Sequence, residues 1–427
     1  MNWQIALLLF GSFIAMLALD FPIALALGLS SALTIVMFSL APLDCVPQLM
    51  FGSSDSFTLL SIPFFIFAGI ILGHTSISRR LIDLADSLVG DIPGGLGIVG
   101  IIAAVFLAGI SGSGPADVAA LGLVLIPAMV RAGYSRGFSS ALSAVSGGIG
   151  IIVPPSIALI IYGSVAEVSI PKLFMAGVLP GIMVAFSLAA ITWFISRRRG
   201  YRPTRLQERM KPLVALRRAL WALLAPVIIL GGIYGGVFTP TEAAAIAVVY
   251  SVAVDALIYR SLGPGDLLRA AGEAGITSAA IMSIVVTASL FAWILNTQGL
   301  ASGTAAIVFS ISGNKIVLLV LLNFALLIAG MFLDAISILY IFMPIILPLL
   351  RQLGVDPVHF GIIATVNLAI GQVTPPVGVN LVAASGVSGE SIGRISREAI
   401  PFLIGECIVL GIITFFPEIS LFLPSLF

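Results

Sequence analysis

The chain has 427 residues, of which 59% are hydrophobic and only 9% are charged, with a net charge of +1. A soluble domain carries about 25% charged residues, so this composition excludes one and indicates a polytopic helical protein of the lipid bilayer. The small net charge indicates no nucleic-acid partner, and Cys45 and Cys407 are too far apart for a metal or redox motif.

The first half of the chain alternates long apolar stretches with short polar segments. Five stretches are predicted to cross the membrane as helices, namely residues 3–19, 22–41, 58–74, 136–164 and 174–195. The first lacks the positive region and cleavage site of a signal peptide, so we expect a retained membrane helix. An amphipathic segment at 76–89 follows the third stretch and is a candidate for lying on the membrane surface.

Two apolar arms, residues 98–110 and 118–130, stand between the third and fourth predicted spans. Each has 13 residues, which as helix is about 20 Å, whereas the bilayer core is about 30 Å thick. We therefore predict a re-entrant helical hairpin at about 97–131 with its tip at 111–117.

The second half shows the same order of segments. Predicted spans are residues 219–236, 243–259, 278–296, 358–386 and 399–423. A second amphipathic segment, at 265–272 before the third of these spans, is likewise a candidate for lying on the membrane surface. A second hairpin is predicted at about 315–351, with longer arms than the first and its tip at 330–334.

Each half contains one span interrupted by two consecutive prolines. These are Pro154-Pro155 in the span at about 136–164 and Pro375-Pro376 in the span at about 358–386. Proline lacks an N–H and clashes with the preceding turn, so both spans are predicted to be broken helices. Carbonyl groups freed in this way must find protein, water or an ion in the membrane.

The matching segments recur at a constant offset along the chain. Gly133 and Gly354, Gly150 and Gly371, and Pro154 and Pro375 are each 221 positions apart. We interpret residues 1–196 and 219–427 as two repeats. Because five crossings per half is an odd number, the second repeat would be inverted in the membrane, as in many secondary transporters. Two unrelated proline-kinked helices are the alternative.

A basic segment at 197–218 joins the two halves. Its single acidic residue is Glu208, and its basic residues are Arg197, Arg198, Arg199, Arg202, Arg205, Arg209, Lys211, Arg217 and Arg218. This bias predicts a cytoplasmic linker, with both termini outside and the two hairpins entering from opposite faces. A lipid-headgroup or nucleic-acid site is the less favoured interpretation.

The hairpin tips and proline breaks carry the polar groups that could bind an ion. Residues 111–117 and 150–155 offer hydroxyls, a carboxylate and unwound carbonyls for a cation such as Na⁺. Residues 330–334 and 371–375, including Thr374, would form a related second site. Close helix packing through small residues is the alternative explanation of both.

Several polar residues have two interpretations. Asp117 and Asp334 could each bind an ion or cap the second helix of its hairpin. Ser156 and Asn380 lie just after the breaks and could contact substrate or pack between helices. Glu406 lies within an apolar span, where a buried hydrogen bond or subunit contact is the preferred interpretation.

Four segments resemble one transporter family along almost the whole chain. They are GSGPADVAALG (112–122), VPPSIALIIYG (153–163), GGIYGGVFTPTEAAAIAVVYS (231–251) and VNLAIGQVTPPVGVNL (366–381). They are similar to the large membrane subunit of tripartite ATP-independent periplasmic (TRAP) transporters. The resemblance implies Na⁺-coupled uptake of organic acids across a bacterial inner membrane by an elevator mechanism, in which the hairpins and broken helices move past a scaffold.

The resemblance also implies site residues and partners. One Na⁺ would be surrounded by Ser111, Ser113, Gly150, Val153 and Pro155. Another would be surrounded by Gly330, Gln372 and Thr374, mostly through backbone carbonyls. A small four-helix membrane subunit, which we expect to be a separate chain, and a periplasmic substrate-binding protein would be the partners. A C4-dicarboxylate is the favoured substrate, with sialic acid and other carboxylates as alternatives.

Two other function classes remain to be tested. Gly109-Ile-Ser-Gly112 matches the local sequence of intramembrane serine proteases, but the only histidines, His74 and His359, are predicted near span ends. We therefore expect no enzyme activity. A passive channel, or a permease that works without a binding protein, is the second alternative.

Overall fold

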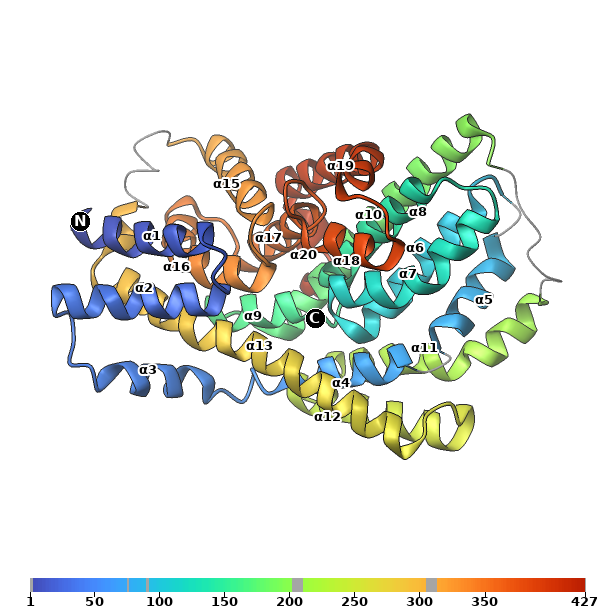
Figure 1. Ribbon diagram of the computed structural model, residues 1–427, viewed down its shortest axis with the longest axis horizontal. Helices are drawn as coiled ribbons and strands as arrows, with labels where there is room; N and C mark the ends of the chain where they lie inside the picture. Colours follow the sequence, from blue (N-terminus) through green and yellow to red (C-terminus); the bar gives the residue numbers. More distant parts are fainter. Residues whose placement is uncertain (1–2, 75–76, 90–91, 202–209, 305–312, 427) are drawn as a thin grey trace.

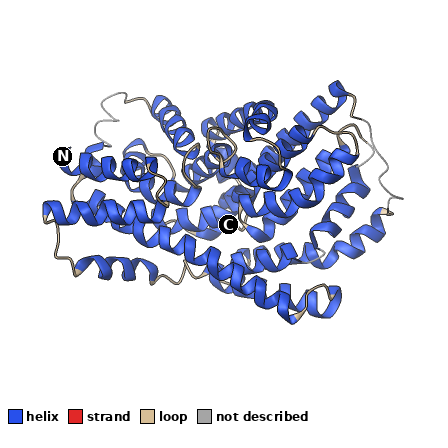
Figure 2. Cartoon of the chain, viewed as in Figure 1, coloured by secondary structure: helices blue, strands red, loops and turns tan. Residues whose placement is uncertain are grey.

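The computed structural model of the protein describes the whole chain except residues 1–2, 75–76, 90–91, 202–209, 305–312 and 427 (Figure 1). All regular structure in these described residues is helical, without strands (Figure 2). The predicted all-helical membrane fold is therefore confirmed. The middle of the predicted basic linker, and part of the segment that precedes the second hairpin, fall outside the described residues.

The helices of the first half are α1 (Trp3–Ala18), α2 (Ile23–Phe38), α3 (Cys45–Ser54), α4 (Ser61–His74), α5 (Ile77–Val89), α6 (Gly95–Ser111), α7 (Gly114–Arg131), α8 (Arg136–Ile152), α9 (Ile157–Ala166) and α10 (Ile170–Arg199). Those of the second half are α11 (Pro212–Tyr234), α12 (Pro240–Val254) with a π-helical end (Asp255–Tyr259), α13 (Pro264–Thr297), α15 (Lys315–Gly330), α16 (Ala335–Leu353), α17 (Pro357–Gly371), α18 (Val379–Ser388), α19 (Ile392–Phe415), α20 (Pro417–Leu421) and a 3₁₀ turn (Pro424–Leu426).

Helix positions recur between the halves. The starts of α7 and α16, and those of α8 and α17, are 221 positions apart. By length and composition, seven of the described helices could cross a membrane, or eight if α8 and α9 form one bent span. Helices α1, α2 and α4 have 14 to 16 residues, fewer than the ~20 that a typical span requires. Ten crossings and the inverted orientation therefore stay predictions.

Three details of the predicted segments were wrong. The arms of the first pair have 17 and 18 residues, not the 13 each that were expected, and those of the second have 16 and 19, so the second pair is not longer. Helices α7 and α16 are long and apolar enough to span a membrane, so arm length does not show that the hairpins are re-entrant. The turn between α6 and α7 is only residues 112–113, because Pro115 favours the first turn of a helix. Residues 265–272 are no separate piece but the start of the 34-residue α13, since no proline interrupts them.

Two further boundaries differ from the prediction. Helix α3 lies in a segment for which no helix was predicted. The last predicted span ends early, because α19 stops at Phe415 before Pro417, and the short α20 begins there. The second amphipathic segment, which was expected to lie on the membrane surface, is instead continuous with a candidate span.

The helices pack as two groups (Figure 1). We call α1–α5 with α11–α13 the scaffold group, and α6–α10 with α15–α20 the hairpin group. Within the scaffold group α2 packs on α13, α4 on α12 and α5 on α11. The main contacts between the groups are α6 against α4 and α5, and α16 against α13. The broken helices lie inside the hairpin group, away from most of the scaffold.

Local caps follow from the sequence. Thr239 caps α12 in a capping box, in which its hydroxyl accepts the Glu242 N–H at 3.2 Å and its own N–H donates to the Glu242 carboxylate at 2.8 Å. Within the hairpin group, Arg199 on α10 pairs with Glu398 on α19 at 2.7 Å. That ion pair ties the two long helices together beside the start of the basic linker.

Candidate functional site

The turn between α6 and α7 rests directly on the first proline break. Gly112 has a φ of 63° and ends α6 in the left-handed conformation, which glycine adopts without strain. A methyl group on Gly112 would lie 2.8 Å from the Pro155 carbonyl oxygen. The Ile157 N–H donates to the Gly112 carbonyl at 3.4 Å. The predicted meeting of hairpin tip and broken helix is thus present in the first half.

The first break itself is short and fully packed. Helix α8 ends at Ile152, the Pro154–Pro155 peptide is cis, and α9 continues at an angle of 40°. Ser156 caps α9 by accepting the Leu159 N–H at 3.3 Å, and its hydroxyl donates to the Ile151 carbonyl at 2.5 Å. Because both functions of this buried hydroxyl are used by the break, it fixes local geometry.

Asp117 lies inside α7, and its side chain does not cap the helix. The N-cap position belongs to Ser113, whose side chain makes no capping bond, whereas the Ser111 hydroxyl donates to one carboxylate oxygen of Asp117. The other oxygen, Oδ2, is buried without a hydrogen-bond partner among the described residues. A methyl group on Gly150 would lie only 2.3 Å from it. The carboxylate therefore faces the backbone just before the break.

Asp334, at the second tip, behaves differently. It is the N-cap of α16, where its carboxylate accepts the N–H of Ile336 at 3.2 Å, the N–H of Ser337 at 3.4 Å and the Ser337 hydroxyl. The capping interpretation is therefore supported for Asp334 and not for Asp117. The two aspartates are also not at matching positions, because they are 217 and not 221 residues apart.

The second tip meets the second break through backbone atoms. A methyl group on Gly330 would lie 2.9 Å from the Cα atom of Gly371. The Met331 carbonyl accepts the N–H groups of Val377 and Gly378 at 3.3 and 3.4 Å, after the cis peptide between Pro375 and Pro376. The Thr374 hydroxyl donates to the Ile370 carbonyl at 2.7 Å, so one of its functions is used within its own helix turn.

Two amide side chains from the second break reach the first hairpin. A methyl group on Gly114 would lie 2.8 Å from the Oε1 atom of Gln372 and 3.2 Å from the Oδ1 atom of Asn380. Neither oxygen has a hydrogen-bond partner among the described residues. The Asn380 amide donates to the Ala144 carbonyl at 3.2 Å. Gln372 was expected at the second site mostly through its backbone carbonyl, and its side chain lies beside the first tip.

These groups concentrate unpaired oxygen atoms in one small volume. A methyl group on Gly150, next to the Asp117 carboxylate, would also lie 3.4 Å from the Gly114 backbone nitrogen. A buried carboxylate oxygen and two buried amide oxygens without partners are costly unless something satisfies them. Oxygen donors of this kind suit hard cations. The described residues hold no cluster of three His, Cys, Asp or Glu side chains, so such a cation would depend on carbonyls, hydroxyls and amides.

The comparisons with known proteins decide the family. The family model for "Tripartite ATP-independent periplasmic transporter, DctM component" matches residues 10–419. The chain belongs to this DctM family. It is 44% identical over 415 residues to the isethionate TRAP transporter permease protein DctMQ of Oleidesulfovibrio alaskensis, covering 97% of this chain and 65% of that protein.

Other relatives match this chain over nearly their whole length. The C4-dicarboxylate TRAP transporter large permease protein DctM of Pseudomonas aeruginosa is 40% identical, covering 94% of each chain. The sialic acid TRAP transporter large permease protein SiaM of Vibrio cholerae is 37% identical, covering 95% of each. The crystal structure of the Alcanivorax borkumensis YdaH transporter, at 16% identity, has a TM-score of 0.60 over 86% of both chains, which shows a shared fold.

The family removes one alternative and leaves one residue open. DctM proteins are transporter permeases, not enzymes, so the protease interpretation of Ser111 is wrong; its hydroxyl is bonded to Asp117. His359 is buried, with Nδ1 3.2 Å from the Ser420 hydroxyl, as expected for packing. Glu406 is buried on α19 beside α10, and its Oε2 atom lacks a partner within the described part of the chain.

The glycines Gly114 and Gly147 were missed as site residues. They let α7, α8 and Asn380 approach closely, since a methyl group on Gly147 would lie 2.8 Å from the Gly114 carbonyl and 3.5 Å from the Asn380 amide nitrogen. The run Ser146-Gly147-Gly148-Ile149-Gly150 was a signal that could have indicated this contact.

Proposed function

We propose that this DctM protein is the permease subunit of a Na⁺-coupled, binding-protein-dependent secondary transporter that imports an organic acid across a bacterial inner membrane. Its partners would be a small four-helix membrane subunit and a periplasmic substrate-binding protein. A C4-dicarboxylate is the favoured substrate because relatives in Pseudomonas aeruginosa and Rhodobacter capsulatus bear that name. Sialic acid and isethionate, which also appear in relatives' names, are the alternatives.

The observation that carries the proposal is the group of unpaired oxygens where the first tip meets both breaks. Asp117, Gln372 and Asn380 each bury an acceptor oxygen without a partner among the described residues. A bound Na⁺ would supply the positive charge that such acceptors lack. The residues that would hold it are Ser111, Ser113, Gly150, Val153 and Pro155 at the first site, with Asp117 beside them. At the second site, Na⁺ would be held by Gly330, Thr374 and the backbone carbonyl of Gln372.

The packing supports movement of the hairpin group as a unit. Its helices contact one another extensively, whereas it meets the scaffold mainly through α6 and α16. The glycine contacts between tips and breaks hold each helix pair, α6–α7 and α15–α16, to its broken helix. The tips would therefore move together with the ion site and not relative to it. Asn380 lies at the start of α18, where its amide and the helix N-terminus would favour a substrate carboxylate. We propose an elevator motion on this basis.

Uptake in proteoliposomes tests the proposal. The complex would be reconstituted with the small subunit, and the binding protein would be added with radiolabelled succinate, with and without an inward Na⁺ gradient. We expect uptake only when the gradient and the binding protein are both present. Na⁺-driven uptake without the binding protein would instead indicate a stand-alone permease. Uptake of labelled sialic acid but not succinate, by the intact complex, would reject only the favoured substrate.

A further inference from the structure

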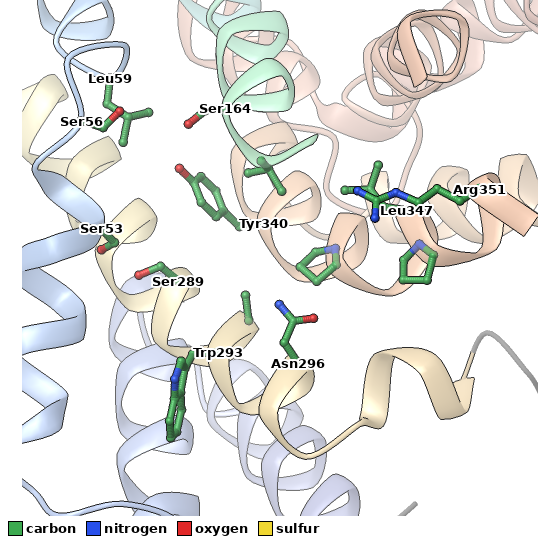
Figure 3. A pocket seen from close by; sticks show the side chains of 14 residues that line it. Ser53, Ser56, Leu59, Ser164, Ser289, Trp293, Asn296, Tyr340, Leu347 and Arg351 are labelled. Atoms are coloured by element: carbon green, nitrogen blue, oxygen red, sulfur yellow. The ribbon is translucent and has the colours of Figure 1, made fainter. Parts of the chain in front are cut away.

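A polar cavity lies away from the proline breaks, between the scaffold group and the hairpin group. Its volume is about 490 Å³, within the roughly 300–1,000 Å³ range of small-molecule sites. Residues of α3, of the segment between α3 and α4, and of α13 form one wall, and residues of α9 and α16 form the other (Figure 3). No residue assigned to the central site above lines it.

The cavity carries one positive charge and no negative charge among its described lining residues. Arg351, near the end of α16, lines it, and no described Asp or Glu lies within ion-pair distance of this guanidinium. A guanidinium presents five donors in a planar fork that matches a carboxylate. An arginine that forms no ion pair with a described residue, at the rim of an open cavity with several polar lining groups, therefore fits a small organic anion.

The remaining polar groups supply both donors and acceptors. The Tyr340 hydroxyl and the Asn296 amide line the cavity and can donate (Figure 3). The hydroxyls of Ser53 and Ser289 already donate to carbonyls of their own helices, at 2.9 and 2.7 Å, so they offer acceptor lone pairs. An anion that also bears a hydroxyl group uses both kinds of partner. Trp293 adds an aromatic wall.

The cavity lies at one end of the molecule. Ser164, Asn296 and Arg351 are near the C-terminal ends of α9, α13 and α16. In Figure 1 the cavity's helices α3 and α16 lie toward the left, whereas α10 and α11 approach the basic linker at the right. Because basic residues favour the cytoplasmic side, the basic linker would be cytoplasmic and this end would face the periplasm. Its two walls belong to different groups, so the cavity would change shape if the groups moved.

We infer that this cavity is a periplasmic entry site for a small hydroxylated organic acid, with its carboxylate on Arg351, separate from the central Na⁺-linked site. The inference rests on the proposed function for its direction of transport. Nothing in the cavity resembles the unpaired oxygen cluster at the breaks, so binding there does not require Na⁺. Binding at the entry site does require the guanidinium.

Thiol protection in right-side-out vesicles carrying the full complex tests the inference. Ser56→Cys, at a lining position to which no binding role is assigned, would be introduced in a Cys45→Ser, Cys407→Ser background. Its reaction with a membrane-impermeant maleimide would be timed with and without malate. At a malate concentration ten times its dissociation constant, the rate of maleimide labelling should fall by about tenfold. The decrease should be the same with and without Na⁺. Succinate, which lacks the hydroxyl, should protect less. Arg351→Gln should abolish protection, and Arg351→Lys should retain part of it.

The controls separate this inference from the proposed function. Arg217→Gln, an exposed arginine on α11 far from the cavity, should leave protection unchanged. Protection that survives Arg351→Gln, or that requires Na⁺, would overturn the entry site. Na⁺-driven malate uptake without any protection would overturn it too, while leaving the proposed function intact. Protection without Na⁺-driven uptake by the same vesicles would support the entry site and reject the proposed Na⁺ coupling.

Discussion

Pro154 and Pro155 are buried, whereas Pro375 and Pro376, at the matching place in the second half, are exposed. The difference comes from the neighbouring helices. Helix α10 covers the first break so closely that a methyl group on Gly177 would lie 2.6 Å from the Ile152 carbonyl. Helix α7 also packs tightly along α8, whereas α16 leans away from α17 toward α13 and α9. The same motif is thus closed in one half and open in the other.

This contrast separates two roles for the breaks. The first is held by backbone contacts, a capping serine and a buried carboxylate, and has little room to change. The second has exposed prolines, and Val377 beside them is 41% exposed. Under an elevator mechanism we expect the first break to act as a fixed ion-binding element. The second would be the part that water or substrate reaches first.

The largest expected effect comes from filling the contact between the first tip and its break. Gly112→Ala places a methyl group against Pro155 at a positive φ. The strain and the overlap together cost about 3 kcal/mol, which lowers the equilibrium constant for packing the tip against the break roughly 100-fold. Uptake in proteoliposomes should fall accordingly. Gly354→Ala is the matched control, with a φ of 60° and open space around it; it should cost only about 1 kcal/mol. Equal losses would contradict the close contact.

The two aspartates give the next largest contrast. Asp117→Asn removes a charge that faces Gly150, so uptake should fall by about tenfold or more, with a higher Na⁺ concentration at half-maximal rate. Asp334→Asn should change uptake by less than about twofold, because asparagine caps a helix nearly as well as aspartate. Na⁺ titrations of uptake would measure both. A larger loss for Asp334→Asn would reverse the roles assigned to the two tips.

A smaller contrast concerns the hydroxyl groups beside the breaks. Ser156→Ala removes a buried cap and leaves the Ile151 carbonyl without a partner, so it should lower the unfolding free energy by about 1–2 kcal/mol. Thr374→Ala removes one bond from a half-exposed side chain and should cost about 0.5 kcal/mol. Thermal unfolding of the purified variants would compare them. Similar shifts in melting temperature would mean that both breaks are equally packed.

The smallest effect should have the opposite sign. Gly386 lies in α18, after the open break, with nothing within 4 Å of a new methyl group. Gly386→Ala should therefore stabilise the protein by about 0.5–1 kcal/mol through helix propensity. In α9, after the closed break, Gly163→Ala would place a methyl group 2.7 Å from Ile170 Cγ1 and should destabilise. Destabilisation by both changes would show that the second break is also closed.

The sequence by itself determined the helical class, the places where helices stop and the recurrence of the breaks. These features depend on chemistry within one helical turn: proline ends a helix, glycine permits a tight turn, and apolar runs require a bilayer. Pairs of helices therefore lie at nearly the residues predicted for the hairpins and broken helices, whereas the re-entrant course of the hairpins stays a prediction. Predictions from local sequence were wrong for α13, which is continuous because no helix-breaking residue interrupts it. They were also wrong for the start of α7, which begins earlier than expected because proline favours the first helical turn.

Only the tertiary structure decided which polar groups meet. Asp117 and Asp334 had the same two interpretations in the sequence, yet one faces Gly150 and the other caps its own helix. Gln372 was assigned to the second site by the family resemblance, but its side chain lies beside Gly114, 258 positions away. Partners of this kind are set by how whole helices pack, because a side chain's contacts come from segments with no local sequence relationship. The exposure of the second break depends on that packing too.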